Sequence, residues 1–489
     1  MLWGYGLKER AVDYQEDATQ GCIRTRGRRS RGWFAASKLL ISIQIRILRR
    51  MELHDDRHFS TIVLTPLFFL ALVRLVGYAV DFARVSLQMD FAAFYAAGQA
   101  MAHGYSPYVN NVVHDPNLWD GWDPMAHSLF IYPPIVAHFF LRLTILGYGP
   151  AKLLWTLANL GWLGIATVLS LRLSGVRLRS IWLLVVGLFV CLFHPVMILL
   201  ERGQIDAITL TLALLAIWLL MRGRRGQMLA GFSFALLTLL KLHGCFVIPF
   251  VVIRKKWVVL IGYFIASCII LFASIVVDGV QANADYVVNQ LPRISKYGHL
   301  GPQELMIDGR LLDGINKYAK DGIQYRWQYW DVGGEASLAR LLRTTFEKNG
   351  IQFNQTLFSA VLLAVFFTIV ELWQRKHPFA IDRMGSRGEL AYWSGILAIV
   401  LLAGPMTWPM NVVWLLPAGV VILTECAKLT GRKQAVWLGV GLLGLAIAAW
   451  TDGPLTFPFV GTGNRYILAE MLVCVSLFGL LDIGLSEPS

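Results

Sequence analysis

The feature that most constrains this chain is a series of long apolar runs separated by polar segments. A run of about 20 apolar residues is long enough to cross the hydrocarbon core of a bilayer as an α-helix. About twelve such runs follow Ser60, at approximately 60–80, 129–147, 151–171, 180–200, 205–221, 227–253, 257–277, 353–373, 389–404, 410–427, 433–450 and 465–483. We therefore expect an all-α polytopic membrane protein with about twelve transmembrane helices.

The composition supports this expectation and excludes an ordinary soluble enzyme. Of 489 residues, 56% are hydrophobic and 15% are charged, whereas a soluble domain carries about 25% charged residues. The net charge of +13 is concentrated in residues 1–50, which hold 11 Lys and Arg against 4 Asp and Glu. The remaining excess is modest, so we expect no nucleic-acid partner. The cysteines lie mostly within or beside apolar runs and indicate neither a disulfide framework nor a metal cluster.

The order of polar and apolar segments suggests four regions. Residues 1–59 are expected to form a basic, disordered cytoplasmic N-terminus, with Met51 as an alternative start. Residues 60–277 form a transmembrane module with an external loop at 81–127, 278–352 form a larger external loop, and 353–489 form the C-terminal transmembrane helices. The sides of the membrane follow from the basic loops after 373 and 427, because Lys and Arg are enriched in cytoplasmic loops.

Successive loops of a chain that crosses a membrane repeatedly should lie on alternate sides, and one run does not fit this alternation. Basic clusters flank the run 227–253 on both sides, and Lys241-Leu242-His243-Gly244 interrupts it. A broken or re-entrant pair of half-helices would keep both clusters on the cytoplasmic side and bring Lys241 toward the outer face. Irregular backbone at such a depth is tolerated only where protein buries it or where it lines a polar cavity.

The stretch 89–108 follows the first run and has helical spacing, but it is too polar to span a membrane. We expect an external amphipathic helix at the outer interface, with Asp90 at its N-terminal end. Two interpretations of Asp90 remain open. It is either a helix N-cap or a carboxylate that takes a proton from a hydroxyl group as a general base.

Three polar patches interrupt the later apolar runs, at 201–206, 241–243 and 404–411. Ionisable groups within membrane runs are costly and are therefore candidates for function. Each patch also has a structural interpretation: a turn for the first, a lysine that reaches the interface for the second, and a helix break at proline and glycine for the third.

Several motifs carry a resemblance to a known family. They are Asp90-Phe91-x-x-Phe94-Tyr95-x-Ala97-Gly98, Gly104-x-x-Pro107-Tyr108, Tyr132-Pro133-Pro134 and Gly203-Gln204-x-Asp206. Together they resemble glycosyltransferase family 87, whose members are polyprenyl-phosphate-sugar-dependent enzymes of the GT-C class. The resemblance covers roughly residues 60–480. The chain is divergent, because Met410 and Asn411 stand where the family has paired histidines.

The resemblance implies a GT-C-like fold and a bacterial inner-membrane mannosyltransferase-like or pentosyltransferase activity. The donor would be a polyprenyl-phosphate-linked sugar, and the acceptor a lipid or glycan on the periplasmic face. Asp90 would be the general base, while the leaving phosphate requires cationic or donor groups, for which we expect Lys241, Arg202 and His243. Contacts to the sugar or the acceptor are expected from Tyr95, Gln204, Asp206, Trp408 and Asn411. Neither a cofactor nor a metal is expected, and the other partners are membrane lipids.

Two other classes of function remain open at this stage. A transporter or lipid flippase also has about twelve spans, broken helices and buried polar residues. Such proteins commonly show two matching halves, and no internal repeat is evident in this chain. A non-catalytic subunit that binds the lipid carrier is the other alternative.

Overall fold

The computed structural model describes residues 57–85, 88–108, 130–176, 181–292, 337–349, 351, 354–378, 380–405, 407–426, 428–429, 431–450 and 464–484. The expectations for residues 1–56, and for most of the loop 278–352, lie outside these ranges. Two compact units are distinguished: Met1–Val63 with Trp450–Phe459, and Leu64–Ala449 with Val460–Ser489. The features discussed below belong to the second unit.

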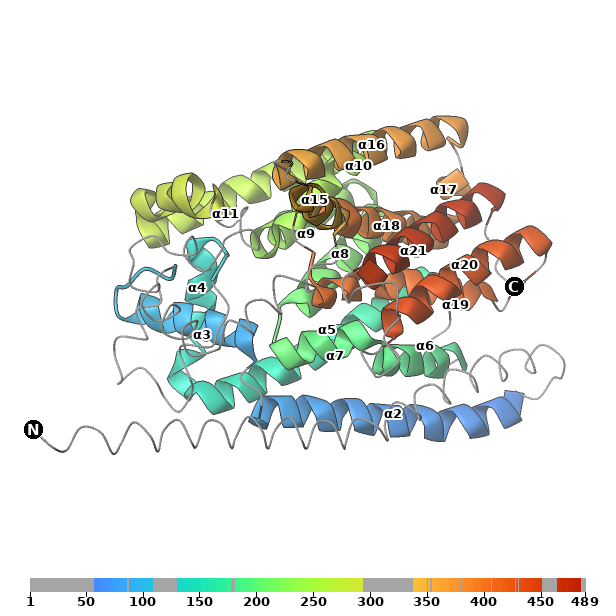
Figure 1. The fold of residues 1–489 in the computed structure, drawn as a ribbon, viewed down its shortest axis with the longest axis horizontal. Helices are drawn as coiled ribbons and strands as arrows, with labels where there is room; N and C mark the ends of the chain where they lie inside the picture. Colours follow the sequence, from blue (N-terminus) through green and yellow to red (C-terminus); the bar gives the residue numbers. More distant parts are fainter. Residues whose placement is uncertain are drawn as a thin grey trace, which may run out of the picture. The chain divides into compact units, whose positions relative to one another are not determined.

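The described residues form helices and contain no β-strand. In chain order the elements are α2 (Arg57–Val85), α3 (Met89–Ala102), α4 (Pro134–Leu141), η3 (Thr144–Leu146), α5 (Tyr148–Leu173), α6 (Ile181–Leu192), α7 (His194–Arg202), α8 (Asp206–Leu220), α9 (Gly223–Leu240), η4 (Leu242–Val247), α10 (Ile248–Ile253), α11 (Trp257–Asp285), η5 (Tyr286–Gln290), α15 (Leu338–Lys348), α16 (Gln355–Lys376), α17 (Ala380–Arg383), α18 (Gly385–Ala403), η7 (Pro409–Leu415), α19 (Leu416–Cys426), α20 (Arg432–Ala449) and α21 (Asn464–Ile483) (Figure 1).

The helical fold class is confirmed, but the expected number of about twelve spans is not. Among the described residues, six helices are long and apolar enough to cross a membrane, or seven if the bent pair α6 and α7 counts as one span. The most apolar stretch of α16 is only 11% buried inside the protein, whereas 89% of the corresponding stretch of η7 and α19 is buried. Helix α16 thus offers its apolar surface to lipid, and η7 with α19 forms part of the core.

The apolar run 129–147 does not form a single spanning helix. Helix α4 contains 8 residues and begins after Pro133, with Pro134 in its first turn. Proline is favoured there because the first turn has no intrahelical partner for its missing N–H. At the other end, Gly147 has a φ of 72° and separates η3 from α5. Position-specific backbone geometry therefore divides a run that composition alone presents as continuous.

The predicted break in the run 227–253 is confirmed. Helix α9 ends at Leu240, and Lys241 has extended backbone angles of φ −157° and ψ 115°. The chain then resumes as η4 and α10. Another break lies between α6 and α7, whose axes differ by 54°, just before Pro195 in the first turn of α7.

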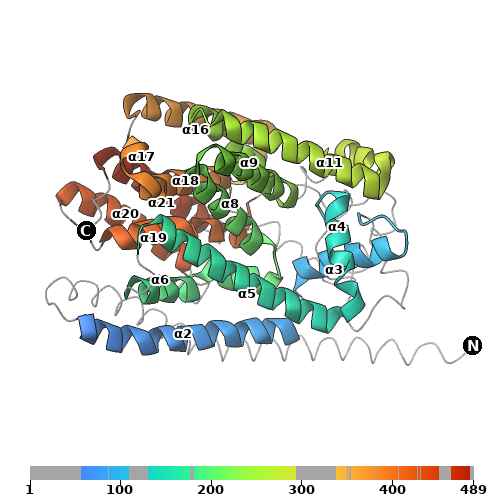
Figure 2. The same ribbon diagram turned by 180° about the vertical axis from the view of Figure 1, so that it is seen from behind.

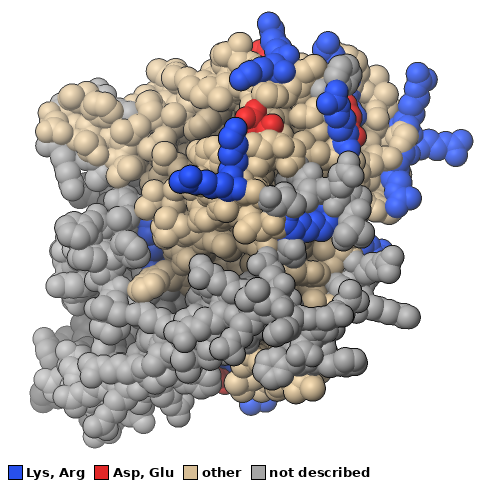
Figure 3. Space-filling model, turned by 90° about the vertical axis from the view of Figure 1, so that its right-hand side faces the viewer, with Lys and Arg blue, Asp and Glu red and all other residues tan. Residues whose placement is uncertain are grey.

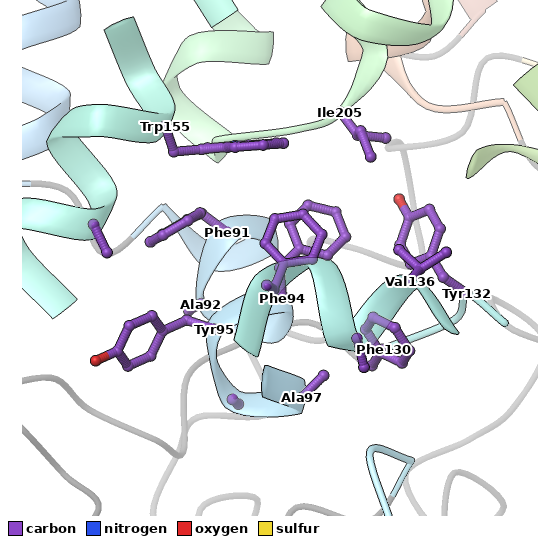
Figure 4. Packing of buried hydrophobic residues seen from close by; sticks show 14 of the residues in the cluster. Phe91, Ala92, Phe94, Tyr95, Ala97, Phe130, Tyr132, Val136, Trp155 and Ile205 are labelled. Carbon is purple, nitrogen blue, oxygen red and sulfur yellow. The ribbon is translucent and has the colours of Figure 1, made fainter. Parts of the chain in front are cut away.

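Helix α3 begins where the sequence predicts, but it is not an amphipathic surface helix. Every residue from Asp90 to Ala100 is buried. Its aromatic side chains pack against α4 and α5: the Phe94 ring stacks on Phe140 at 4.4 Å and lies 6.0 Å from Trp155 (Figure 4). The expectation of an interfacial helix was wrong because neighbouring helices, which local periodicity does not reveal, cover the surface of α3.

Ion pairs join the elements at one end of this unit. Arg254 donates to Glu389 at 2.7 Å and to Asp382 at 3.0 Å, and His377 lies 2.8 Å from Asp482. Exposed basic side chains occupy the turns at this end: Arg222, Arg224, Arg225, Lys255, Arg375, Lys376, Arg383, Arg432 and Lys433. Figure 3 shows Lys and Arg gathered on this face. Figures 1 and 2 place α3 and α4 at the opposite end from α17.

Candidate functional site

The first part of the site is an ion pair between α3 and α7. Arg202 Nε donates to Asp90 Oδ2 at 2.6 Å, and Nη2 donates to Oδ1 at 2.7 Å. This is the bidentate geometry that a planar guanidinium forms with a carboxylate. The side chains of Arg202 and Asp90 are only 17% and 7% exposed, respectively. The N-cap interpretation of Asp90 is not supported, because Gln88 occupies the N-cap position and no side-chain cap is formed.

A glycine turn brings the next residues to this pair. Gly203 ends α7 with a φ of 67°, in the left-handed region that favours glycine. A Cβ atom at this position would lie 2.7 Å from the Cβ of Phe91. The Gly203 carbonyl accepts a hydrogen bond from Trp155 Nε1 at 2.7 Å. The close approach of α7 to α3 therefore depends on glycine, and it places Gln204 beside Asp90.

Gln204 connects the ion pair to the segment before α4. Its Nε2 donates to Asp90 Oδ2 at 3.3 Å. Its Oε1 accepts from the Ile205 backbone N–H at 2.8 Å and from the Tyr132 hydroxyl at 3.1 Å. The Gln204 side chain is thus held at both ends of its amide group.

A second ion pair lies two residues further along the chain. Asp206, in the first turn of α8, is fully buried. Its Oδ1 accepts from Lys241 Nζ at 2.6 Å, and its Oδ2 accepts from Asn411 Nδ2 at 3.1 Å. These contacts bring together α8, the break after α9, and η7. The break predicted at Lys241 therefore delivers the ammonium group to a carboxylate.

Two further predicted site residues, His243 and Trp408, lie close in sequence to Lys241 and Asn411, which both contact Asp206. The buried His243 ring packs against Trp414 at 6.3 Å. The side-chain oxygen of Asn411 accepts from the backbone N–H of Trp408, the N-cap residue of η7, at 2.8 Å. Neither contact assigns a role to His243 or Trp408, and their expected roles stay predictions.

Tyr95 lies apart from the two ion pairs. Its side chain is 1% exposed and belongs to the aromatic cluster, with its ring centroid 5.1 Å from that of Tyr148. Its hydroxyl donates to the Thr144 carbonyl at 3.4 Å. Figure 4 shows Tyr95 directed away from Tyr132. The contacts of Tyr95 are structural, and the prediction that it binds substrate gains no support from them.

Tyr132 is a candidate site residue that was not predicted from the sequence. Its hydroxyl is buried, and burial, followed by the negative charges of Asp206 and Asp90, raises the pKa of Tyr132 well above its usual value. Tyr132 therefore lies within the electrostatic reach of both carboxylates. Its place in a Tyr-Pro-Pro motif was the available signal, but the motif alone did not connect it to Gln204.

The site as a whole balances two carboxylates with two cations. Asp90 of α3 pairs with Arg202 of α7, and Asp206 of α8 pairs with Lys241, which follows α9. Buried charges are stable only when they are paired in this way. Within the described ranges, no group of three or more His, Cys, Asp or Glu side chains is placed to hold a metal ion.

One comparison with known proteins agrees with the later of these motifs. The model of glycosyltransferase family 87 matches residues 130–317, which confirms the stated resemblance over that part of the chain. The matched range contains Tyr132, the turn 202–206 and Lys241, but neither Asp90 nor Asn411. No match was found among curated proteins or among solved structures.

Proposed function

From the premise that the match to glycosyltransferase family 87 indicates a membrane glycosyltransferase, we propose that this chain transfers a sugar from a polyprenyl-phosphate donor to a lipid or glycan acceptor. The sugar is mannose-like or a pentose. The reaction takes place at the outer, periplasmic face of a bacterial inner membrane, and it uses the site built around Asp90 and Asp206.

The proposed chemistry is a single displacement at the anomeric carbon. Asp90 takes the proton of the acceptor hydroxyl, and the acceptor oxygen forms a bond to the anomeric carbon. The bond from that carbon to the phosphate oxygen breaks, and its electron pair leaves with the polyprenyl phosphate. A cation beside the phosphate stabilises the charge on the leaving group, and Lys241 and Arg202 are the groups proposed for this task.

The observation that carries this proposal is the environment of Asp90. A carboxylate that accepts two charge-assisted hydrogen bonds from Arg202 and one from Gln204 is held in one orientation. A substrate hydroxyl that gives its proton to Asp90 would donate to one of these two carboxylate oxygens. The Asp206 and Lys241 pair lies on the adjoining turn and supplies an ammonium group with three N–H donors.

The sidedness of the proposal rests on the distribution of basic residues. The exposed Lys and Arg side chains described above belong to helix ends that lie opposite α3 and α4 (Figures 1 and 2). Because basic residues are retained on the cytoplasmic side, the end that carries Asp90 is proposed to face outward. A lipid-linked donor with its headgroup at the outer interface would then reach the site directly.

The proposal is tested by incubating the purified protein with a panel of radiolabelled polyprenyl-phosphate sugars and membrane-lipid or glycan acceptors. We expect transfer by the native chain and none by Asp90→Asn. Asp81→Asn is the matched control, since it makes the same chemical change at an exposed position of α2. Donor binding without transfer by the native chain would favour a lipid-carrier-binding subunit. Movement of an intact lipid between leaflets would favour a flippase.

A further inference from the structure

The hydroxyl group of Tyr132 is joined to the candidate site by a hydrogen bond to the side chain of Gln204. It donates to Gln204 Oε1 at 3.1 Å, and the Ile205 backbone N–H donates to the same atom at 2.8 Å. A backbone N–H can only donate, so the atom that receives it must be the amide oxygen. The amide nitrogen then faces the Asp90 carboxylate, 3.3 Å from Oδ2.

We propose that Tyr132 is a positioning residue for sugar transfer, because its hydroxyl holds the Gln204 amide in the orientation that directs an N–H donor at Asp90. This inference rests on the proposed function, in which Asp90 is the general base. Tyr132 acts through Gln204 and need not touch the substrate.

Contacts of its ring and of its backbone hold Tyr132 in place. The ring lies 5.0 Å from Phe94 and 5.5 Å from Phe130, and the backbone carbonyl accepts from the Tyr108 hydroxyl at 2.8 Å. The raised pKa of Tyr132, which follows from burial and the nearby carboxylates, keeps the hydroxyl protonated at physiological pH. It therefore remains a donor to Gln204 at that pH.

The consequence for Asp90 has a definite sign. An N–H donor stabilises the ionised form of a carboxylate more than the protonated form. When the Gln204 amide is no longer held, the ionised carboxylate loses one hydrogen-bond donor, and the acid limb of the kcat/KM profile is expected to move to higher pH. Arg202 pairs with this carboxylate, and Asp206 acts together with Asp90 on Tyr132, but the substitution of Tyr132 changes the charge of neither Arg202 nor Asp206.

The test compares Tyr132→Phe with Tyr286→Phe in the full-length protein. Tyr286 is the matched control because it is 7% exposed, as Tyr132 is, and belongs to the same aromatic cluster. The Tyr286 hydroxyl donates to the Ile131 carbonyl at 3.5 Å and does not contact Gln204. The pH dependence of kcat/KM is measured for both variants, together with the midpoint of thermal unfolding.

We expect Tyr132→Phe to lower kcat/KM by about three- to tenfold, the worth of one hydrogen bond, and to move the acid limb upward. Tyr286→Phe is expected to leave the acid limb where it is. In a Gln204→Ala background, the substitution of Tyr132 should have little further effect, because the group it positions is gone. Additive losses, or equal shifts of the acid limb in both tyrosine variants, would overturn the inference.

A second variant covers the case in which Tyr132→Phe does not fold. Gln204→Glu keeps the shape of the side chain but replaces the N–H donor with a carboxyl oxygen beside Asp90. The acid limb should then move to higher pH because like charges oppose ionisation, and an unchanged limb would overturn the inference. Failure of the proposed function itself gives a different result, since Asp90→Asn would then retain turnover whatever happens at Tyr132.

Discussion

Asp90→Asn is the most informative perturbation of this protein, because Asp90 combines a structural and a proposed chemical role. The two hydrogen bonds from Arg202 to Asp90 end on the two carboxylate oxygens, at 2.6 and 2.7 Å. The substitution replaces one of them with an amide NH2 group and removes the negative charge. Loss of turnover alone would therefore leave two explanations, a missing base and the loss of the ion pair between Asp90 and Arg202.

The magnitudes of the two effects can be estimated separately. Loss of a positioned general base costs about 10²–10⁴ in rate, or about 2.7–5.4 kcal/mol in the barrier. Removal of one partner from a buried ion pair costs about 3–5 kcal/mol of stability. The exposure of Arg202, 17%, is small enough to place the pair in this regime rather than among surface pairs, and it favours the lower end of the range.

The double variant Asp90→Asn with Arg202→Gln separates the two effects. It removes both charges, so we expect thermal stability in detergent to return toward that of the native protein. Transfer of radiolabelled sugar in a single turnover should stay undetectable, because neither side chain can take the proton. The single variant Arg202→Gln keeps the carboxylate and is expected to retain measurable transfer.

Two results would refute this reasoning. Turnover by folded Asp90→Asn within about threefold of the native rate would show that no base is lost, since the expected effect is at least about 10². Recovery of transfer in the double variant would show that Asp90 matters only as the partner of Arg202. In either case the proposed single displacement would need another base.

Three further predictions follow from the same contacts. Lys241→Met should raise the Kd for radiolabelled polyprenyl phosphate about tenfold or more, because a hydrogen bond to a charged group is worth about 1.5–3 kcal/mol. An unchanged Kd would show that Lys241 does not bind the donor phosphate. Since the pKa of Tyr132 is raised on folding, the contribution of this group to stability should be constant below about pH 10 and be lost above it, where only the unfolded chain loses this proton. Tyr132→Phe should therefore make the fall in stability above about pH 10 shallower in thermal unfolding. A membrane-impermeant maleimide added outside the cell should label Tyr105→Cys, because this position near α3 is 44% exposed. Lys255→Cys should react only after the membrane is permeabilised. The opposite pattern would reverse the proposed orientation.

Features that depend on neighbouring residues in the chain followed from the sequence. The start of α3 next to Asp90 and the break at Lys241 were both predicted, because an interruption of an apolar run changes the local helix regardless of what packs against it. Helix ends that are set by proline and glycine were harder to predict. The run 129–147 was counted as a span, although Pro133 and Gly147 confine α4 and η3 to short pieces.

The pairing of the charges was decided only by the tertiary structure. Arg202 and Asp90 lie 112 positions apart, and Asn411 and Asp206 lie 205 positions apart. All four were predicted as site residues. Arg202, Asp206 and Asn411 lie in polar patches that interrupt apolar runs, where such groups are costly, and Asp90 begins the helix with the family-like motif. The cations were expected to bind a phosphate and Asp206 a sugar, whereas in the folded chain each cation already has a carboxylate partner. Hydropathy and spacing report local periodicity. Which distant turns meet depends on how the helices pack, and that packing also buried α3 on every side and brought Tyr132 to Gln204.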